Sequence, residues 1–366
     1  MRTTSSSFIT ASFLLSLGTG TALAQHAISV PAEIEYNSNP ALTPDGESAM
    51  LYRVAPQYTI TRESGPTRSV LSFGGVLERS SDTRVSANRA DPNISYELEL
   101  SAPTSVITLN ASLEEASSRT TEFLETGRVT EDSTLRTGLA GARWAKQLSE
   151  STSLELAGGY SQVRYDTPLL VGYSETRAES SLGWQPADGS RFSLAVAAAR
   201  LNPDNNAERS RRQGLLVSHE RQLSPTFSAQ IGVGTVKTSG ARAGRDTVGN
   251  LQLVYAGERL SSEIEWVREI SPSGSVGGYT LSRGVAWGLS YPLTASTTLT
   301  SRYSRARSLE IDGSTGQSLA FGLRSELTAF WSMTVRLERA RATLASGARA
   351  NGNAIGIGLV YAHPNL

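Results

Sequence analysis

Few side chains in this sequence have the types and spacing that acid–base or metal chemistry requires. The histidines are His26, His219 and His363, and there is no cysteine. The absence of cysteine excludes disulfides, thiolate metal sites and a cysteine nucleophile. His219 follows Leu215 and Val217 at alternate positions, so a strand would turn it outward with them, away from any inward-facing serine. We therefore expect no catalytic residue, no metal site and no cofactor.

Pairs of glutamates spaced by two residues are the other candidates for chemistry. They are Glu33 and Glu35, Glu97 and Glu99, and Glu263 and Glu265. Side chains two residues apart lie on the same face of a strand. General acid–base or metal chemistry would need a second strand that converges on each pair, and the sequence does not indicate one. The pairs are interpreted as part of a wetted polar wall.

The elements that position these residues have a period of two. Val285, Trp287, Leu289 and Tyr291 alternate with Ala286, Gly288 and Ser290, and the stretches 28–37, 93–100 and 318–327 alternate in the same way. Such alternation is typical of β-strands with one apolar and one polar face. The apolar set in 281–291 is expected to face lipid and the intervening set to face water.

About 18 candidate strands can be placed, with 16 as the alternative. They begin near residues 28, 50, 69, 93, 105, 134, 153, 174, 191, 212, 226, 247, 260, 281, 296, 317, 331 and 352. Long polar links such as NSNPALTPDGES alternate with short ones such as QLSEST and QLSPT. Long loops on one side and tight turns on the other predict an all-β fold, a transmembrane antiparallel up-and-down β-barrel of the bacterial outer membrane.

Aromatic residues gather near both ends of these strands, as expected of the two membrane interfaces. Tyr36, Tyr52, Tyr160, Trp266 and Tyr303 lie near the loop ends, and Tyr58, Trp184, Tyr255, Tyr291, Trp331 and Tyr361 near the turn ends. A β-solenoid has no reason to alternate long and short links. A soluble sandwich of this length would not expose an apolar strip on every strand.

The N-terminus has the features of a secretory signal peptide. Arg2 precedes a short apolar stretch, 8–17, and Ala22-Leu23-Ala24 fits a cleavage site, so residues 1–24 are interpreted as the signal and 25–366 as the barrel. An N-terminal membrane anchor is the alternative, but the apolar stretch is shorter than the ~20 residues that a spanning helix needs. The first strand starts close to the cleavage site, so no plug or further domain is expected.

The polar faces of the strands predict a water-filled lumen of mixed charge. A barrel of about 16 to 18 strands is wide enough for an aqueous channel. The candidate lumen-lining residues are Glu33, Glu35, Arg53, Glu97, Glu99, Glu155, Glu263, Glu265, Arg302, Arg324, Glu326, Arg336 and Glu338. The formal net charge is zero, so no nucleic-acid partner is expected.

One long loop, Glu114 to Asp132, stands out by its charge. It carries Glu114, Glu115, Glu122, Glu125, Glu131 and Asp132 against Arg119 and Arg128. We hypothesise that it folds inward, narrows the channel and favours cations through its local field. The alternative is a solvated surface loop.

Three stretches carry a family resemblance: IEYNSNPAL, YRVAPQYTITRESGPTRSVLSFGGVLERSSD and TGLAGARWAKQLSESTSLELAGGYSQVRYD. With them the sequence resembles outer-membrane β-barrel proteins associated with exopolysaccharide and PEP-CTERM (exosortase) systems. The resemblance implies assistance in polysaccharide export, with export components as partners and no catalytic residues. The mixed lumen charge departs from the strongly basic tunnel that an acidic polymer would need.

The leading functional hypothesis is therefore a channel that assists exopolysaccharide export. A general diffusion porin for small solutes, a non-conducting structural or adhesive barrel and a barrel-embedded enzyme are the alternatives. The expected partners are outer-membrane lipid and the barrel-assembly machinery. The final strand presents Ile355, Ile357, Leu359 and Tyr361 at alternate positions, which is similar to the terminal signal that this machinery recognises.

Overall fold

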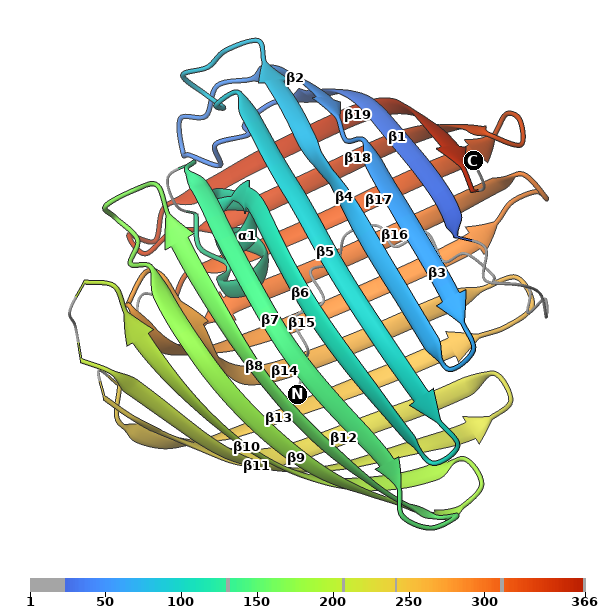
Figure 1. The fold of residues 1–366 in the computed structure, drawn as a ribbon. Helices are drawn as coiled ribbons and strands as arrows, with labels where there is room; N and C mark the ends of the chain where they lie inside the picture. Colours follow the sequence, from blue (N-terminus) through green and yellow to red (C-terminus); the bar gives the residue numbers. More distant parts are fainter. Residues whose placement is uncertain (1–23, 130–131, 206–207, 241, 310–312, 365–366) are drawn as a thin grey trace.

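The chain forms a closed antiparallel β-barrel of 18 membrane strands (Figure 1). The structure, a computed structural model, describes residues 24–364 except 130–131, 206–207, 241 and 310–312. The signal peptide predicted at 1–24 therefore lies almost wholly outside the described residues. Each strand pairs with its neighbours in the sequence, and β1 pairs with β19 to close the sheet. The predicted fold and strand number are confirmed.

The strands and the one helix of the described residues have the following bounds. They are β1 (Gln25–Asn37), β2 (Ala49–Val54), β3 (Gln57–Ser64), β4 (Thr67–Ser80), β5 (Arg89–Ala102), β6 (Ser105–Ser117), α1 (Ser118–Thr126), β7 (Thr134–Gln147), β8 (Thr152–Tyr165), β9 (Tyr173–Ala187), β10 (Ser190–Pro203), β11 (Ser210–Ser224), β12 (Phe227–Ser239), β13 (Gly244–Ala256), β14 (Ser261–Ser273), β15 (Gly278–Pro292), β16 (Thr297–Ser308), β17 (Thr315–Glu326), β18 (Trp331–Thr343) and β19 (Arg349–His363).

β2 and β3 are two halves of one membrane strand. Both pair with β1 in a single register, Ala32 opposite Val54 and Ile28 opposite Tyr58. The ladder is interrupted at Pro56, because proline has no N–H to donate. The carbonyl of Pro56 still accepts from the N–H of Gly75 on β4, at 3.1 Å. This interruption explains why 19 segments make 18 spans.

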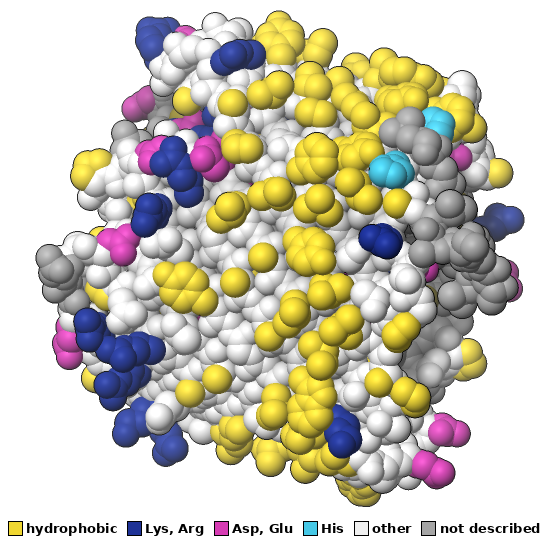
Figure 2. All heavy atoms as spheres, in the orientation of Figure 1, with side chains coloured by type: hydrophobic (Ala, Val, Ile, Leu, Met, Phe, Trp, Pro, Cys, Tyr) yellow, Lys and Arg dark blue, Asp and Glu magenta, His cyan; other side chains and the backbone are white. Residues whose placement is uncertain are grey.

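Side chains alternate between lipid and lumen along the membrane-spanning part of each strand, as the period of two requires. Val196 on β10 pairs with Leu215 on β11, and both are about half exposed on the outer wall. Figure 2 shows apolar side chains spread over this outward face of the barrel. An apolar band on the outside of a closed sheet fits a lipid environment, so the protein lies in the bacterial outer membrane.

The two ends of the barrel differ in their connections. One end has tight turns, such as that between β9 and β10, where Gly189 has a φ of 69° that glycine adopts without strain. The other end carries the long loops and α1, and we assign it to the extracellular side by analogy with other outer-membrane barrels. Among the described residues, no helix has both the length and the apolarity to cross a membrane.

Candidate functional site

The loop between β6 and β7 folds into the barrel and forms α1 there (Figure 1). The helix begins after Ser117, whose hydroxyl accepts from the N–H of Thr120. It ends at Gly127, whose left-handed conformation lets its N–H bond to the carbonyl of Phe123. α1 contacts β15, β16 and β17 across the lumen from β6. The loop was predicted to begin at Glu114, but β6 extends to Ser117. From Ser118 onward the described part of the loop folds inward as predicted, and the surface-loop alternative is wrong for it.

Small residues on the opposite wall of the barrel leave room for α1 to pack against it. Phe123 is buried and packs with Leu42, Ala342 and Ala350. Gly316 lies directly beneath it, because a Cβ there would be 2.8 Å from the Phe123 ring and 2.9 Å from the Cα of Gly127. A larger side chain at position 316 would therefore displace α1.

A second element, the hairpin of β14 and β15, also leans into the lumen. β14 pairs with β13 only as far as Arg268, opposite Gly249, and from Glu269 onward it pairs with β15 alone. Ile270, Tyr279 and Leu281 of the hairpin are buried. They form a cluster with residues from the outer ends of β7 to β12, namely Leu135, Val163, Tyr173, Ala199, Leu201 and Val236. The hairpin thus covers this side of the extracellular mouth.

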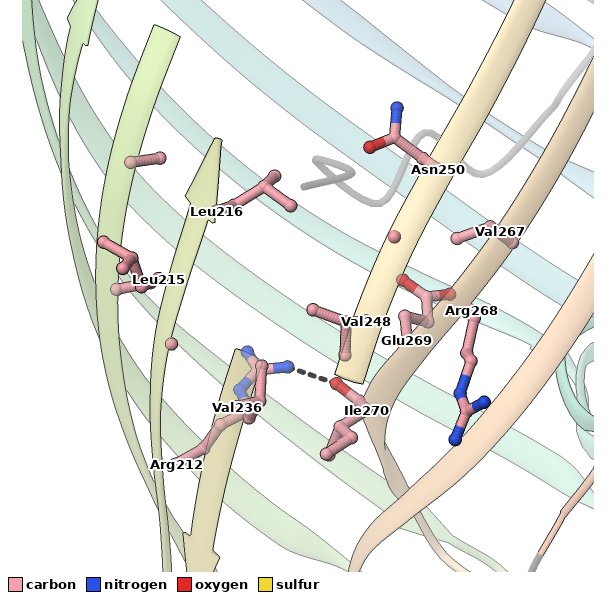
Figure 3. Close-up of a pocket in the computed structure, with 14 residues that line it drawn as sticks. Arg212, Leu215, Leu216, Val236, Val248, Asn250, Val267, Arg268, Glu269 and Ile270 are labelled. Carbon is pink, nitrogen blue, oxygen red and sulfur yellow. Dashed lines mark hydrogen bonds between the residues drawn. The ribbon is translucent and has the colours of Figure 1, made fainter. Parts of the chain in front are cut away.

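Arg212 on β11 holds the hairpin in place (Figure 3). Its guanidinium donates to the carbonyl oxygen of Ile270. The same group lies 3.7 Å from a carboxylate oxygen of Glu175 and 5.2 Å from the centre of the Tyr279 ring. The hydroxyl of Tyr279 donates to Glu175 at 2.7 Å. Beside this contact is a cavity of about 80 Å³, lined on the lumen side by Val236, Val248 and Val267.

α1 and the hairpin meet inside the barrel and form the constriction. Arg128, just after α1, donates to the hydroxyl of Ser275 at the hairpin turn. Tyr165 on β8 donates to Glu122 at 3.3 Å and packs its ring against Gly274 of the same turn. These contacts link the two inward elements to each other and to the wall.

Acidic side chains dominate the constriction. Glu122 is buried in α1, and this burial raises its pKa. Glu125 reaches lumen solvent, but surrounding protein desolvates it. That desolvation, with repulsion from Glu122 and Glu269, raises the pKa of Glu125 to about 7. Its charge therefore changes within the neutral pH range.

Three of the predicted lumen residues form an ion cluster on β1 and β2, next to the β1–β19 pairing that closes the barrel. Arg53 lies 3.3 Å from Glu33, 3.8 Å from Glu35 and 2.6 Å from Glu78. Register places Arg53 directly opposite both Glu33 and Glu78 on adjacent strands. Glu78 belongs to this cluster and was missed by the sequence analysis, although it is an isolated acid in an apolar stretch.

The remaining predicted lumen residues are spread around the wall. Three ion pairs involve them: Glu97 lies 3.9 Å from Arg68, Glu155 lies 2.6 Å from Arg143, and Arg336 pairs with Glu338. Two more carboxylates accept hydrogen bonds from neutral side chains: Glu263 from Gln252 at 2.6 Å, and Glu99 from Ser101 at 2.9 Å. Glu265 is opposite Ala286 on the inward face. In the described part of the chain, Arg302, Arg324 and Glu326 make no ion pair. The structure thus gathers Glu33, Glu35 and Arg53, and it pairs Arg336 with Glu338 on the neighbouring part of the wall, where Arg336 and Glu35 lie in register on either side of Gly356. It distributes the others.

Charge is sorted between the two faces of the wall. On the described strands every carboxylate except Glu115 lies at an inward position of the alternation. Many basic residues lie instead at outward positions in the extracellular half of the strands: Arg79, Arg136, Arg164, Arg200, Arg211, Lys237, Arg245, Arg283, Arg305, Arg307, Arg339 and Arg341. The lumen is consequently more acidic than the neutral sequence implies.

His219 faces outward at the turn end, as the sequence indicates. It stacks on Phe192, with ring centres 4.2 Å apart, and its Nε2 lies 3.1 Å from the hydroxyl of Ser190. This serine was not foreseen, but no carboxylate among the described residues bonds the other ring nitrogen, so the pair lacks the third group of a triad. No group of three potential metal ligands occurs in the described residues.

The sequence analysis did not predict that the β14–β15 hairpin folds into the lumen, and it did not predict the apolar side chains that the hairpin packs against. Leu135, Val163 and Leu201 lie at lumen-facing positions, where the alternation predicts polar residues. These apolar residues at inward positions near the strand ends could have predicted the hairpin, because an aqueous lumen does not favour apolar side chains unless another element covers them.

Comparison with known structures identifies the class of fold as that of the outer-membrane Occ/Opd channels. Pseudomonas aeruginosa OccK9 (OpdG) aligns at a TM-score of 0.53 with 13% identity, over 93% of this chain and 98% of that chain. Pseudomonas aeruginosa OccK7 (OpdD) aligns at 0.53 with 11% identity, over 93% and 99%. Acinetobacter baumannii OccAB4 aligns at 0.53 with 9% identity, over 93% and 98%. At these identities the likeness shows the fold. No family model matches the sequence, and a search of curated proteins finds no relative.

Proposed function

We propose that this protein is a passive, cation-preferring channel for small polar solutes. One observation carries the proposal: α1 and the β14–β15 hairpin narrow the lumen from opposite walls, and Glu122, Glu125 and Glu269 lie where they approach each other. While these carboxylates are ionised, their negative field at the constriction lowers the energy of a passing cation and raises that of an anion.

Planar-bilayer recording of the refolded protein tests this function. The expected results are stepwise conductance and a reversal potential, in a salt gradient, that reports cation preference. Glu122→Gln/Glu125→Gln should lower that preference, whereas Glu97→Gln, on the open wall, should change it less. Absence of conductance would favour a non-conducting structural barrel. Conductance with anion preference would contradict the role of the constriction.

Passage of an exopolysaccharide is the second candidate, supported by the sequence resemblance to export-associated barrels. An extended polymer would have to displace α1 or the hairpin, both of which have buried contacts with the wall. Titrating candidate glycans into the same recording separates the two functions. A block by one polymer that persists under an applied potential would favour export over free diffusion.

Assembly and export partners are also proposals. Ile355, Ile357 and Leu359 are exposed on the lipid face of β19, where the barrel-assembly machinery would read a terminal strand. Crosslinking from this strand during assembly would test that partner, and co-purification with export components would test the second.

A further inference from the structure

Four basic residues form a row on the outside of the barrel at its extracellular end. Arg200 on β10, Arg211 on β11, Lys237 on β12 and Arg245 on β13 make up this group, which we call the rim patch. All four side chains are exposed. Figure 2 shows basic side chains gathered at the lower left, over the loop ends of the strands in this part of the wall.

The register places like charges next to each other within the rim patch. Arg200 is directly opposite Arg211, and Lys237 is directly opposite Arg245. Arg211 and Lys237 are diagonal neighbours, because Gln213 is opposite Lys237. Like charges directly opposite each other destabilise a sheet unless another group compensates them.

Nothing in the described chain neutralises the rim patch. No carboxylate of the described residues lies within ion-pair distance of any of its four residues, whereas one other opposed pair of outward arginines is compensated. Arg136 is opposite Arg164, and Arg136 is bound by Glu115 at 2.8 Å and by Asp166 at 3.2 Å. The positive charges of the rim patch are therefore available to bind an anion from outside the protein.

The depth of the rim patch indicates where that anion lies. Arg200 is four residues beyond Val196, a half-exposed residue of the lipid-facing band. At about 3.3 Å per residue, this puts Arg200 roughly 13 Å farther along the tilted strand. Basic side chains just beyond the apolar band lie at the level of lipid head groups.

We propose that the rim patch binds the phosphate groups of an outer-leaflet lipid head group. Guanidinium groups bind phosphate oxygens through two parallel hydrogen bonds, and a row of them can hold more than one phosphate. The bound phosphates would offset the repulsion between Arg200 and Arg211 and between Lys237 and Arg245. The lipid would thus become part of the wall over β10–β13.

Binding of defined lipids to the purified, folded protein tests the proposal. Native mass spectrometry would compare bisphosphorylated lipid A, its monophosphorylated form and phosphatidylethanolamine. The variant Arg200→Gln/Arg211→Gln/Lys237→Gln should weaken binding of bisphosphorylated lipid A at least tenfold. Binding should also weaken as salt rises, because the contacts are exposed charges.

Arg221→Gln is the matched control. Arg221 is an exposed outward residue on the same strand as Arg211, but it lies near the turn end of β11. It should leave lipid A binding unchanged. Equal loss in this control would overturn the proposal in favour of non-specific charge.

Two further outcomes would also overturn the proposal. Unchanged lipid A binding in the triple variant would show that the rim patch is not the site. Competition by inorganic phosphate at the same concentration as lipid A would show a phosphate site without lipid specificity. Far-UV circular dichroism and unchanged conductance would establish that the variants are folded.

Discussion

The lumen and the outer rim of this barrel are built from the same strands but have opposite charge character. On β11, Arg211 points outward to the rim patch, and its neighbour Arg212 points inward to Glu175 and Ile270. Carboxylates collect in the lumen, whereas the extracellular half of the outer face is basic. A net charge of zero therefore conceals two strongly different surfaces.

The difference teaches that strand phase, and not composition, sets the electrostatics of a barrel. Water and neighbouring bases stabilise lumen carboxylates such as Glu33 and Glu155. An outward arginine can extend its charged head toward lipid phosphates, but an outward carboxylate would face the anionic head groups. Four matched pairs of substitutions would break or sharpen this contrast.

The largest expected effect comes from moving a charge from the lumen face to the lipid face. Val196→Arg places a cation on the lipid side of β10, where the cost is ~2–4 kcal/mol at the membrane midplane. Ser193→Arg places the same group at an inward position of β10 that is nearer the turn end and away from the hairpin, at little cost. Folding free energies into lipid vesicles should differ accordingly. Equal destabilisation, or the reverse order, would contradict the phase of this strand.

Displacing α1 is expected to change conduction strongly without unfolding the wall. Gly316→Val inserts a side chain where Phe123 and Gly127 pack, so the helix should undock and single-channel conductance should rise roughly twofold. Gly288→Val is the control, because a Cβ at Gly288 meets nothing within 4 Å. A conductance rise in both variants, or in neither, would argue against a constriction at α1.

Adjacent arginines on β11 allow the two faces to be compared directly. Arg212→Met removes the bond to Ile270 and the partner of Glu175, so the hairpin should loosen and current fluctuations should increase. Arg211→Met removes only a rim charge and should leave the current unchanged. The measurement is open-channel noise at constant voltage. Similar noise in the two variants would mean that Arg212 does not hold the hairpin.

The smallest effect should be a pH dependence of ion preference. The pKa of Glu125 is raised to about 7, so its carboxylate is charged above that pH and neutral below it. Cation preference should therefore decline as pH falls from about 8 to about 6. Glu125→Gln should remove this decline, and Glu326→Gln, near the turn end of the lumen, should preserve it. A decline that survives Glu125→Gln would assign the titration to another group.

The sequence by itself determined the strands and their two faces, and it predicted about 18 strands with 16 as the alternative. The period of two in stretches such as 281–291 leaves one apolar face, and a chain with many such strands can bury its edges only by closing. The same phase placed Glu33, Arg53 and Glu263 on the polar side. These conclusions depend on neighbours in the sequence, and so sequence alone is sufficient for them.

Only the tertiary structure decided what fills the mouth and which charges meet. Phe123 packs against Gly316 and Ala342, which lie about 200 residues away in the sequence. The β14–β15 hairpin packs against Leu201. Such contacts depend on the curvature of the closed barrel, which brings opposite walls within reach of a loop. Arg200 and Arg211 likewise become neighbours only through strand register, and strand phase then determines that a neutral chain has an acidic channel and a basic rim.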